Sequence, residues 1–179
     1  MYRAVALWAL RAGIDVNDML RLEQLAREAR IEFKDGRVYL NGEEATAAIR
    51  EPAVSAAASQ VSMVPGVRRA MREEQRRIGV ANSVVMEGRD IGTVVFPDAQ
   101  IKIYLDADPG IRAERRAKET GGPVDRIAQE IAERDDRDRS RAEAPLTQAP
   151  DAEYIDSSGM TPDQVEEAIL KIVRRRTSN

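Results

Sequence analysis

The chain has 179 residues, of which 42% are apolar and 33% charged, which is typical of a folded globular protein with a substantial core. Its net charge of −3 and pI of about 5.3 count against general nucleic-acid binding, so we expect any phosphate recognition to be local. Because cysteine and histidine are both absent, thiolate nucleophiles, disulfides and histidine bases are excluded. The sequence has no apolar run long enough for a membrane span, and we expect a cytoplasmic protein.

The first half of the chain predicts helices around a small β insert. Helical periodicity of apolar residues predicts four helices, over residues 1–12, 15–29, 52–61 and 67–78. The first of these begins at Met1 with no Ser, Thr, Asp or Asn before it as a cap. Residues 30–48 instead alternate as strands do, and Asp35-Gly36 is a strong signal for a hairpin turn.

The second half alternates strands and helices, which is the order expected for a parallel α/β sheet. Apolar runs predict strands at residues 83–86, 101–105 and 154–156. Helical stripes and caps predict helices over residues 109–120, 124–141 and 162–173. Charged and glycine residues at 87–93 follow the first strand, at the position where α/β proteins bind ligands, although an ordinary glycine-containing turn is the alternative.

Residues 133–141 contain four arginines and three aspartates. In a helix, one face of this stretch carries Arg134, Arg137, Asp138 and Arg141. The same face continues the apolar stripe of Ile127 and Ile131, so it is predicted to point inward. Clustered arginines on an inward face require an anion, which favours a phosphate-containing ligand. A solvated face with pairs between charges four residues apart is the alternative.

Several stretches resemble the bacterial cytidylate kinases, which belong to the nucleoside monophosphate kinases. The longest matches are residues 87–99 and 133–141, and shorter ones occur at residues 2–4, 54–55, 58–61 and 67–68. The resemblance extends over essentially all 179 residues. It implies an α/β fold of the P-loop nucleoside monophosphate kinase type, with a parallel sheet flanked by helices in a single domain. It also implies a monophosphate-binding insert at 30–62 and a lid region at 115–126.

The implied reaction is transfer of the γ-phosphoryl group of ATP, with Mg²⁺, to CMP or dCMP in pyrimidine nucleotide metabolism. The resemblance assigns the substrate to seven residues: Ser59, Arg68 and Arg141 at the cytosine, Arg134 and Asp138 at the ribose, and Arg3 and Arg89 at the phosphate. It implies catalytic roles for Arg89, Asp90 and Arg137, and places Arg115 in the lid over ATP. No motif dedicated to a metal is present beyond Asp90, and we expect a monomer with no nucleic-acid or membrane partner.

The sequence departs from the family in one respect, because none of its eleven glycines lies in a G-x-x-x-x-G-K-S/T phosphate loop. We expect a unit of roughly 30 residues, with the first strand and this loop, to be missing before Tyr2. The uncapped start agrees, and our hypothesis is that Met1 is an internal methionine of a longer protein. We therefore predict little or no kinase activity for these residues alone.

Two other functions remain open on the sequence. A non-catalytic CMP-binding module would use the same substrate residues without turnover of ATP. An RNA-binding protein would use the arginines of 68–77 and 112–116, although the acidic pI and the lack of aromatic platforms count against it.

Overall fold

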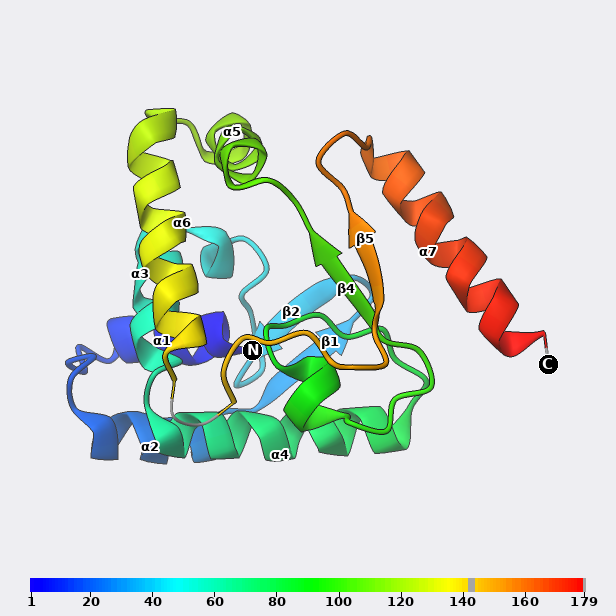
Figure 1. Cartoon of the computed structure of the whole chain (residues 1–179). Helices are drawn as coiled ribbons and strands as arrows, with labels where there is room; N and C mark the ends of the chain where they lie inside the picture. The colour runs from blue at the N-terminus through cyan, green and yellow to red at the C-terminus, as the bar shows by residue number, and fades with distance from the viewer. Residues whose placement is uncertain (142–143, 179) are drawn as a thin grey trace. The chain divides into compact units, whose positions relative to one another are not determined.

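The computed structural model describes residues 1–141 and 144–178. Within it the chain divides into two compact units, Met1–Val84 and Val85–Asn179, and each is described by itself (Figure 1). The first unit combines helices with a small antiparallel sheet, and the second combines helices with a small parallel sheet. The single domain expected over residues 1–179 stays a prediction.

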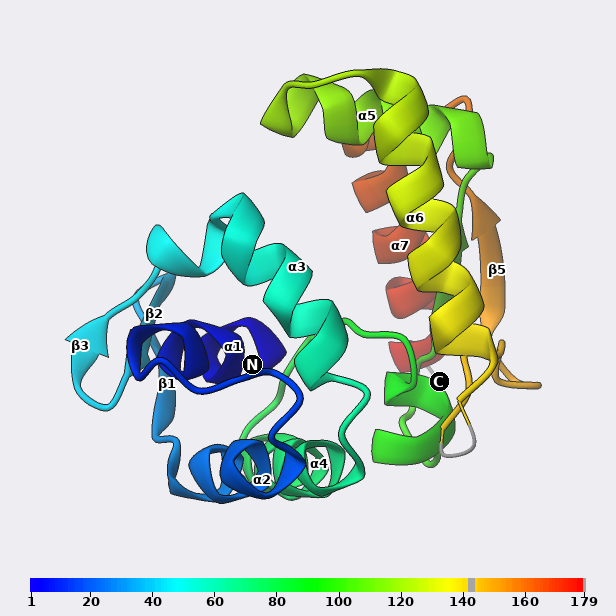
Figure 2. The ribbon, with the colours of Figure 1, turned by 90° about the vertical axis from the view of Figure 1, so that its left-hand side faces the viewer.

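The four helices predicted in the first unit are confirmed: α1 (Tyr2–Arg11), α2 (Met19–Glu28), α3 (Pro52–Val61) and α4 (Pro65–Ala81). The Asp18 side chain caps α2 by accepting from the Arg21 amide at 3.0 Å, and α1 begins after Met1 with no side-chain cap. Helix α1 packs against both α2 and α3, and Figure 2 shows it between them. The apolar faces that meet there form the core of this unit, whose fully buried side chains include Val5, Leu22, Val54, Val61 and Met71.

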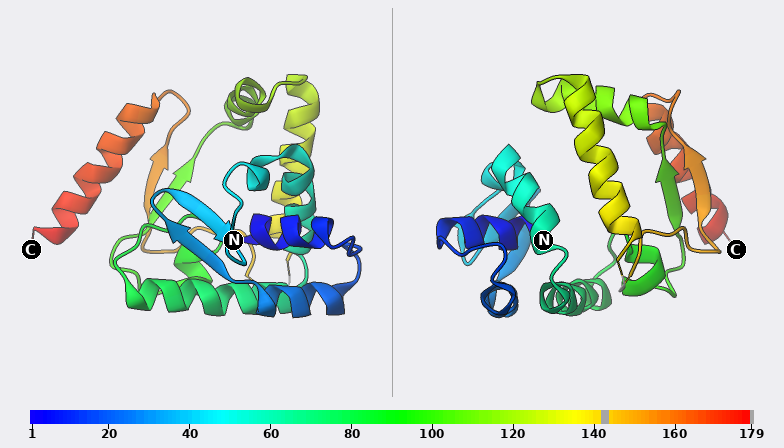
Figure 3. Two further views of the ribbon diagram at one scale, coloured as in Figure 1. Left: turned by 180° about the vertical axis from the view of Figure 1, so that it is seen from behind. Right: turned by 60° about the vertical axis from the view of Figure 1, so that its left-hand side comes forward.

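The predicted β insert is an antiparallel sheet of β1 (Ile31–Lys34), β2 (Arg37–Leu40) and β3 (Glu43–Glu44), which Figure 3 shows from behind. Asp35 and Gly36 adopt φ angles of 52° and 72°, so both turn residues lie in the left-handed region that a type I′ hairpin turn requires. Asn41 and Gly42 make a second such turn, with φ angles of 53° and 86°. A short 3₁₀ turn, Ala48–Arg50, then leads into α3.

The second unit contains β4 (Ile103–Asp106), α5 (Pro109–Thr120), α6 (Val124–Arg139), β5 (Glu153–Asp156) and α7 (Pro162–Thr177). The two strands pair in parallel, with Ile103 opposite Glu153 and Asp106 opposite Asp156. This confirms the predicted α/β class with a small parallel sheet flanked by helices. The predicted start of α5 is also confirmed, because the Asp108 side chain accepts from the Gly110 amide at 2.8 Å and Pro109 occupies the first turn.

Helix α7 begins with the predicted capping box of Thr161 and Gln164. Its last turns lie beside the start of β5, because Arg175 and Arg176 both pair with Glu153, at 2.7 and 3.0 Å. The predicted apolar stripe of α7 is only half-buried, since a two-stranded sheet offers little surface for it to cover.

The strand predicted at residues 83–86 is wrong, because these residues have no regular secondary structure. Val85 is fully exposed rather than buried. A β-strand exists only through hydrogen bonds to a neighbouring strand, and no strand among the described residues pairs with this segment. The apolar composition of residues 83–86 predicted a buried strand, but in the described part of the chain Val84 and Val85 are exposed.

Within residues 1–141 and 144–178, no helix has both the length and the apolar character needed to cross a bilayer.

Candidate active site

The loop that follows Arg89 in the second unit is a tight turn around Asp90. The Asp90 carbonyl accepts from the amides of Val94 at 2.9 Å and Val95 at 3.2 Å, which closes the π-helical turn Ile91–Val95. Turns of this type are frequent at functional sites. Asp90 itself is buried, with 9% of its surface exposed, and it directly follows Arg89.

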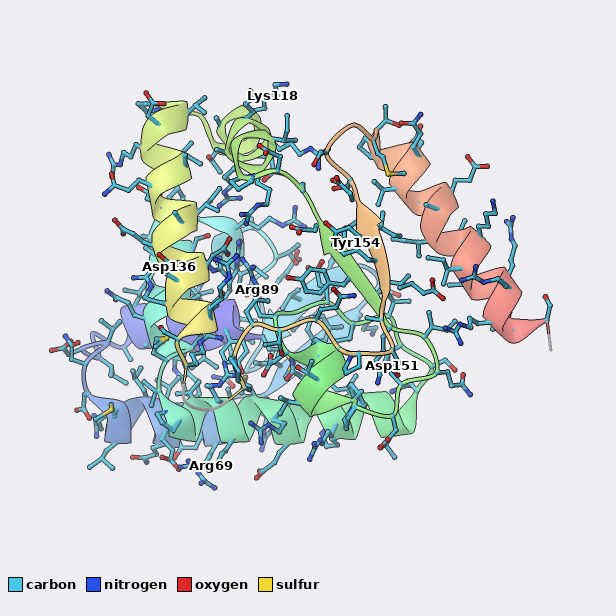
Figure 4. The ribbon with its side chains drawn as sticks, viewed as in Figure 1. Arg69, Arg89, Lys118, Asp136, Asp151 and Tyr154 are labelled. Atoms are coloured by element: carbon cyan, nitrogen blue, oxygen red, sulfur yellow. The ribbon has the colours of Figure 1, made fainter. Side chains whose placement is uncertain are left out.

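Lys102 braces the end of this loop. Its ammonium group donates to the Pro97 carbonyl and to both carboxylate oxygens of Asp151, at 2.8 and 2.9 Å (Figure 4 labels Asp151). The hydrogen bond from Lys102 holds the pKa of the Asp151 carboxyl below its ordinary value. Because Lys102 directly precedes β4, this contact fixes the loop relative to the sheet.

The inward face of α6 carries Asp135 together with the predicted Asp138, and not the predicted Arg134 and Arg137. Asp135 and Asp138 are 3% and 1% exposed, whereas Arg134 and Arg137 are exposed. The helix continues the spacing of four from Ile127 through Ile131 to Asp135, so Asp135 is the next residue on that stripe. The inward placement is therefore wrong for Arg134 and Arg137, while the side chains of Asp138 and Arg141 are buried as predicted. The extension of the helix to Arg141 is also wrong, because α6 ends at Arg139.

Arginines surround these two aspartates from several elements. The Arg89 guanidinium reaches both, with Nη1 3.1 Å from Asp135 Oδ1 and Nε 3.5 Å from Asp138 Oδ2. Figure 4 shows Arg89 beside α6. Arg112 of α5 places Nη1 2.5 Å from Asp135 Oδ2. Asp138 also pairs with Arg141, which lies just beyond the helix, and with Arg134 Nε at 3.9 Å.

This arginine–aspartate cluster, defined by Arg89, Arg112, Arg134, Asp135, Asp138 and Arg141, has an excess of positive charge. Its four guanidinium groups and two carboxylates leave a formal charge of +2. Two of the arginines, Arg89 and Arg134, keep side-chain exposures of 36% and 45%, so a ligand in solution has access to them. A doubly charged phosphate monoester has the charge and the acceptor geometry that such a cluster favours.

The other predicted substrate residues lie in the first unit. Arg3 is in the first turn of α1 and donates to the Ile49 carbonyl at 3.3 Å. Ser59 is half-buried on α3, where its carbonyl accepts from the Ser62 hydroxyl at 2.8 Å. Arg68 is in the first turns of α4 and is 4% exposed. Their predicted contacts with CMP stay predictions.

The two residues predicted to contact ATP differ in their surroundings. The Arg115 guanidinium donates to the hydroxyl of Ser157 at 3.1 Å and to the Ser157 carbonyl at 2.6 Å. It also donates to the Met160 carbonyl at 3.2 Å. It thus fastens α5 to the loop after β5. Arg137 is exposed, and in the described part of the chain no carboxylate pairs with it. The predicted roles of both residues stay predictions.

Sequence reasoning missed Asp135 and Arg112. The repeat of Ile127, Ile131 and Asp135 at intervals of four was a signal that could have found Asp135. Arg112 carried no such signal, because it is one of several basic residues on α5 and only the packing of α5 on α6 distinguishes it. Among the described residues, no group of three or more acidic side chains is arranged to hold a metal ion.

Fold and site together define an α/β protein with a cationic arginine–aspartate cluster in its second unit. The family profile described as cytidylate kinase matches residues 1–175. The cytidylate kinase of Solibacter usitatus is 58% identical over 186 residues, which cover 100% of this chain and 80% of that protein. The cytidylate kinases of Pelotomaculum thermopropionicum and Syntrophotalea carbinolica are 49% and 45% identical, covering 98% of this chain and 80% and 79% of those proteins. The chain belongs to the cytidylate kinase family, whose members are phosphotransferases.

Proposed function

We propose that this chain carries the CMP-binding and phosphoryl-transfer residues of a cytidylate kinase, which transfers the γ-phosphoryl group of ATP to CMP or dCMP. The observation that carries this proposal is the arginine–aspartate cluster, which joins Arg89 of the 87–99 stretch to Asp138 and Arg141 of the 133–141 stretch. These are the two long stretches that resemble the family, and they meet in one cationic site.

The chemistry needs no histidine base, because the attacking oxygen belongs to a phosphate that is already anionic. Catalysis then rests on positioning the two phosphates and on neutralising the charge that develops between them. In related phosphoryl-transfer enzymes an arginine in this role contributes about 10³–10⁵ in rate. Arg89 and Arg137 are our candidates, since Arg89 is held within the cluster and Arg137 is exposed on the same helix as Asp138.

The remaining assignments follow the family resemblance. Arg134 and Asp138 hold the ribose of CMP, Arg141 contacts the cytosine, and Asp90 lies beside the CMP phosphate. Ser59 and Arg68 contact the cytosine, Arg3 contacts the phosphate, and Arg115 belongs to the lid over ATP. Mg²⁺ enters with ATP, bound to its phosphates. The protein acts as a cytoplasmic monomer.

A second candidate function is a non-catalytic CMP-binding module. The observation that favours it is the absence of a G-x-x-x-x-G-K-S/T sequence from residues 1–179, since that loop holds the β- and γ-phosphates of the donor in P-loop enzymes. We therefore propose that these residues alone bind CMP but turn over slowly.

One pair of measurements separates the two functions. CMP binding to the chain, with its mass verified, is measured by calorimetry, and CMP-dependent formation of ADP from ATP is followed by phosphorus NMR. Binding with robust ADP formation supports the kinase and contradicts slow turnover. Binding with no detectable ADP supports the binding module. Tighter binding to an unrelated RNA than to CMP would overturn both functions.

A further inference from the structure

Asp135 is a buried carboxylate to which the proposed reaction assigns no part. It lies on the inward face of α6, one turn beyond Ile131, and 3% of its surface is exposed. A buried carboxylate is unfavourable unless charged partners compensate for its lost hydration. The groups that pair with Asp135 therefore indicate the role of this buried carboxylate.

Those partners are two arginines from different elements. Oδ2 is 2.5 Å from Nη1 of Arg112 on α5, and Oδ1 is 3.1 Å from Nη1 of Arg89 in the loop before the π-helical turn. Oδ2 accepts a hydrogen bond from Arg112, and Oδ1 faces Arg89 as an ion pair without hydrogen-bond geometry. The carboxylate links α6, α5 and the loop at one point.

The link fixes Arg89 on two sides. Asp135 holds its Nη1, and Asp138 lies 3.5 Å from its Nε. A guanidinium group with a carboxylate close to each of two nitrogens is favoured in one orientation by charge attraction. Arg89 nevertheless keeps 36% side-chain exposure, so its outer edge remains accessible to a ligand.

We propose that Asp135 is a positioning residue for phosphate binding, which fixes Arg89 in the orientation that holds the CMP phosphate and couples that orientation to α5 through Arg112. This inference rests on the proposed function, because it takes the CMP phosphate as the ligand of Arg89. Asp135 does not contact the phosphate itself, since two anions repel each other. Its effect is therefore expected only on ligands that carry the phosphate.

The test compares CMP with cytidine, which lacks the phosphate, by calorimetry on the full chain. Asp135→Asn keeps the size of the side chain and removes its charge, so its new amide group faces one of the two arginines without pairing with it. We expect CMP affinity to fall roughly tenfold, as for the loss of one charge-assisted contact, with cytidine affinity unchanged. The matched control is Asp136→Asn, because the Asp136 side chain is 81% exposed and its ion pair with Arg139, at 3.6 Å, lies at the surface. That control should leave both affinities unchanged.

The outcomes separate this inference from the proposed function. Failure of the wild-type chain to prefer CMP over cytidine would overturn the proposed function and this inference with it. A preference that persists at full size in Asp135→Asn would overturn only the positioning role. If Asp135→Asn does not fold, Arg112→Gln replaces it, since that variant removes the other end of the bridge and leaves Asp135 paired with Arg89. A reduced CMP-to-cytidine ratio in Arg112→Gln supports the proposal, and an unchanged ratio overturns it.

Discussion

Asp138 is the residue on which the site is centred. It is 1% exposed, and Arg89, Arg134 and Arg141 converge on its carboxylate. The sequence placed Asp138 correctly on the inward face, because its spacing from Ile127 and Ile131 is helical. It could not distinguish Arg134 from Asp135 as the other inward residue, since the rotation of a helix about its axis is set by packing and not by its own periodicity.

Arg141→Ala should weaken CMP binding by about 1.5–3 kcal/mol, because it removes a charge-assisted contact from a side chain that is 8% exposed. Calorimetry of CMP binding measures the loss. Arg139→Ala is the matched control, as the Arg139 side chain is 61% exposed and its pair with Asp136 lies at the surface. Equal CMP affinities of the two variants would contradict a contact between Arg141 and CMP and leave Arg141 only a structural role.

Asp138→Ala should destabilise the second unit by about 3 kcal/mol, at the low end of the range for breaking a buried pair, because two of its three arginines keep contact with water. Urea unfolding measured without ligand tests this. Asp136→Ala, which removes an exposed carboxylate two residues away, should change stability by less than about 0.5 kcal/mol. Similar losses in the two variants would contradict a central structural role for Asp138.

At the scale of elements, the sequence predicted those turns and helix caps that depend on a few neighbouring residues. The hairpin at Asp35-Gly36, the cap at Asp108 and the capping box at Thr161 were all predictable because a few neighbouring residues determine each of them. The strand at residues 83–86 was not, since strand formation depends on a partner elsewhere in the chain. The half-burial of α7 was unpredictable for the same reason, as periodicity indicates which face is apolar and not how much surface covers it.

Gly36→Ala should destabilise the first unit by about 1 kcal/mol. Gly36 has a φ of 72° with open space around its Cα, so a new methyl group meets no neighbour and the cost is conformational alone. Gly36→Asn is the control, because asparagine tolerates the left-handed region better than alanine does. Fluorescence of Trp8, which packs against the core of this unit, follows its unfolding in urea. Equal stability of the alanine and wild-type proteins would contradict the turn assignment.

The contact of α7 with β5 should weaken in acid. The hydrogen bonds from Arg176 and Arg175 lower the pKa of Glu153 below its ordinary value of 4.5. A carboxyl group with a lowered pKa stabilises the folded state fully above its unfolded pKa, and that contribution is lost as pH falls through the folded pKa. Wild type should therefore be more stable than Glu153→Gln at pH 7, and the difference should shrink as pH falls below about 4.5. A difference that stays constant from pH 7 to pH 3 would exclude this contact as its source.

At the scale of the whole molecule, the resemblance predicted the family, and the match over residues 1–175 confirmed it. The division into two compact units was not predictable, because it depends on which contacts are dense and which are sparse after folding. The buried core of Val5, Leu22 and Met71 belongs to the first unit, and the arginine–aspartate cluster belongs to the second. Hydrophobic burial thus dominates one unit and charge pairing is concentrated in the other.

The central claim is that this chain binds CMP through its cationic site and selects the cytosine base. Its most direct test is a calorimetric titration of the chain with CMP, UMP and AMP under identical salt and pH. All three carry the same phosphate charge, so only base recognition separates them. We predict that CMP binds at least about tenfold more tightly than UMP or AMP, as expected from one charge-assisted contact to the base. UMP or AMP binding as tightly as CMP would contradict the claim.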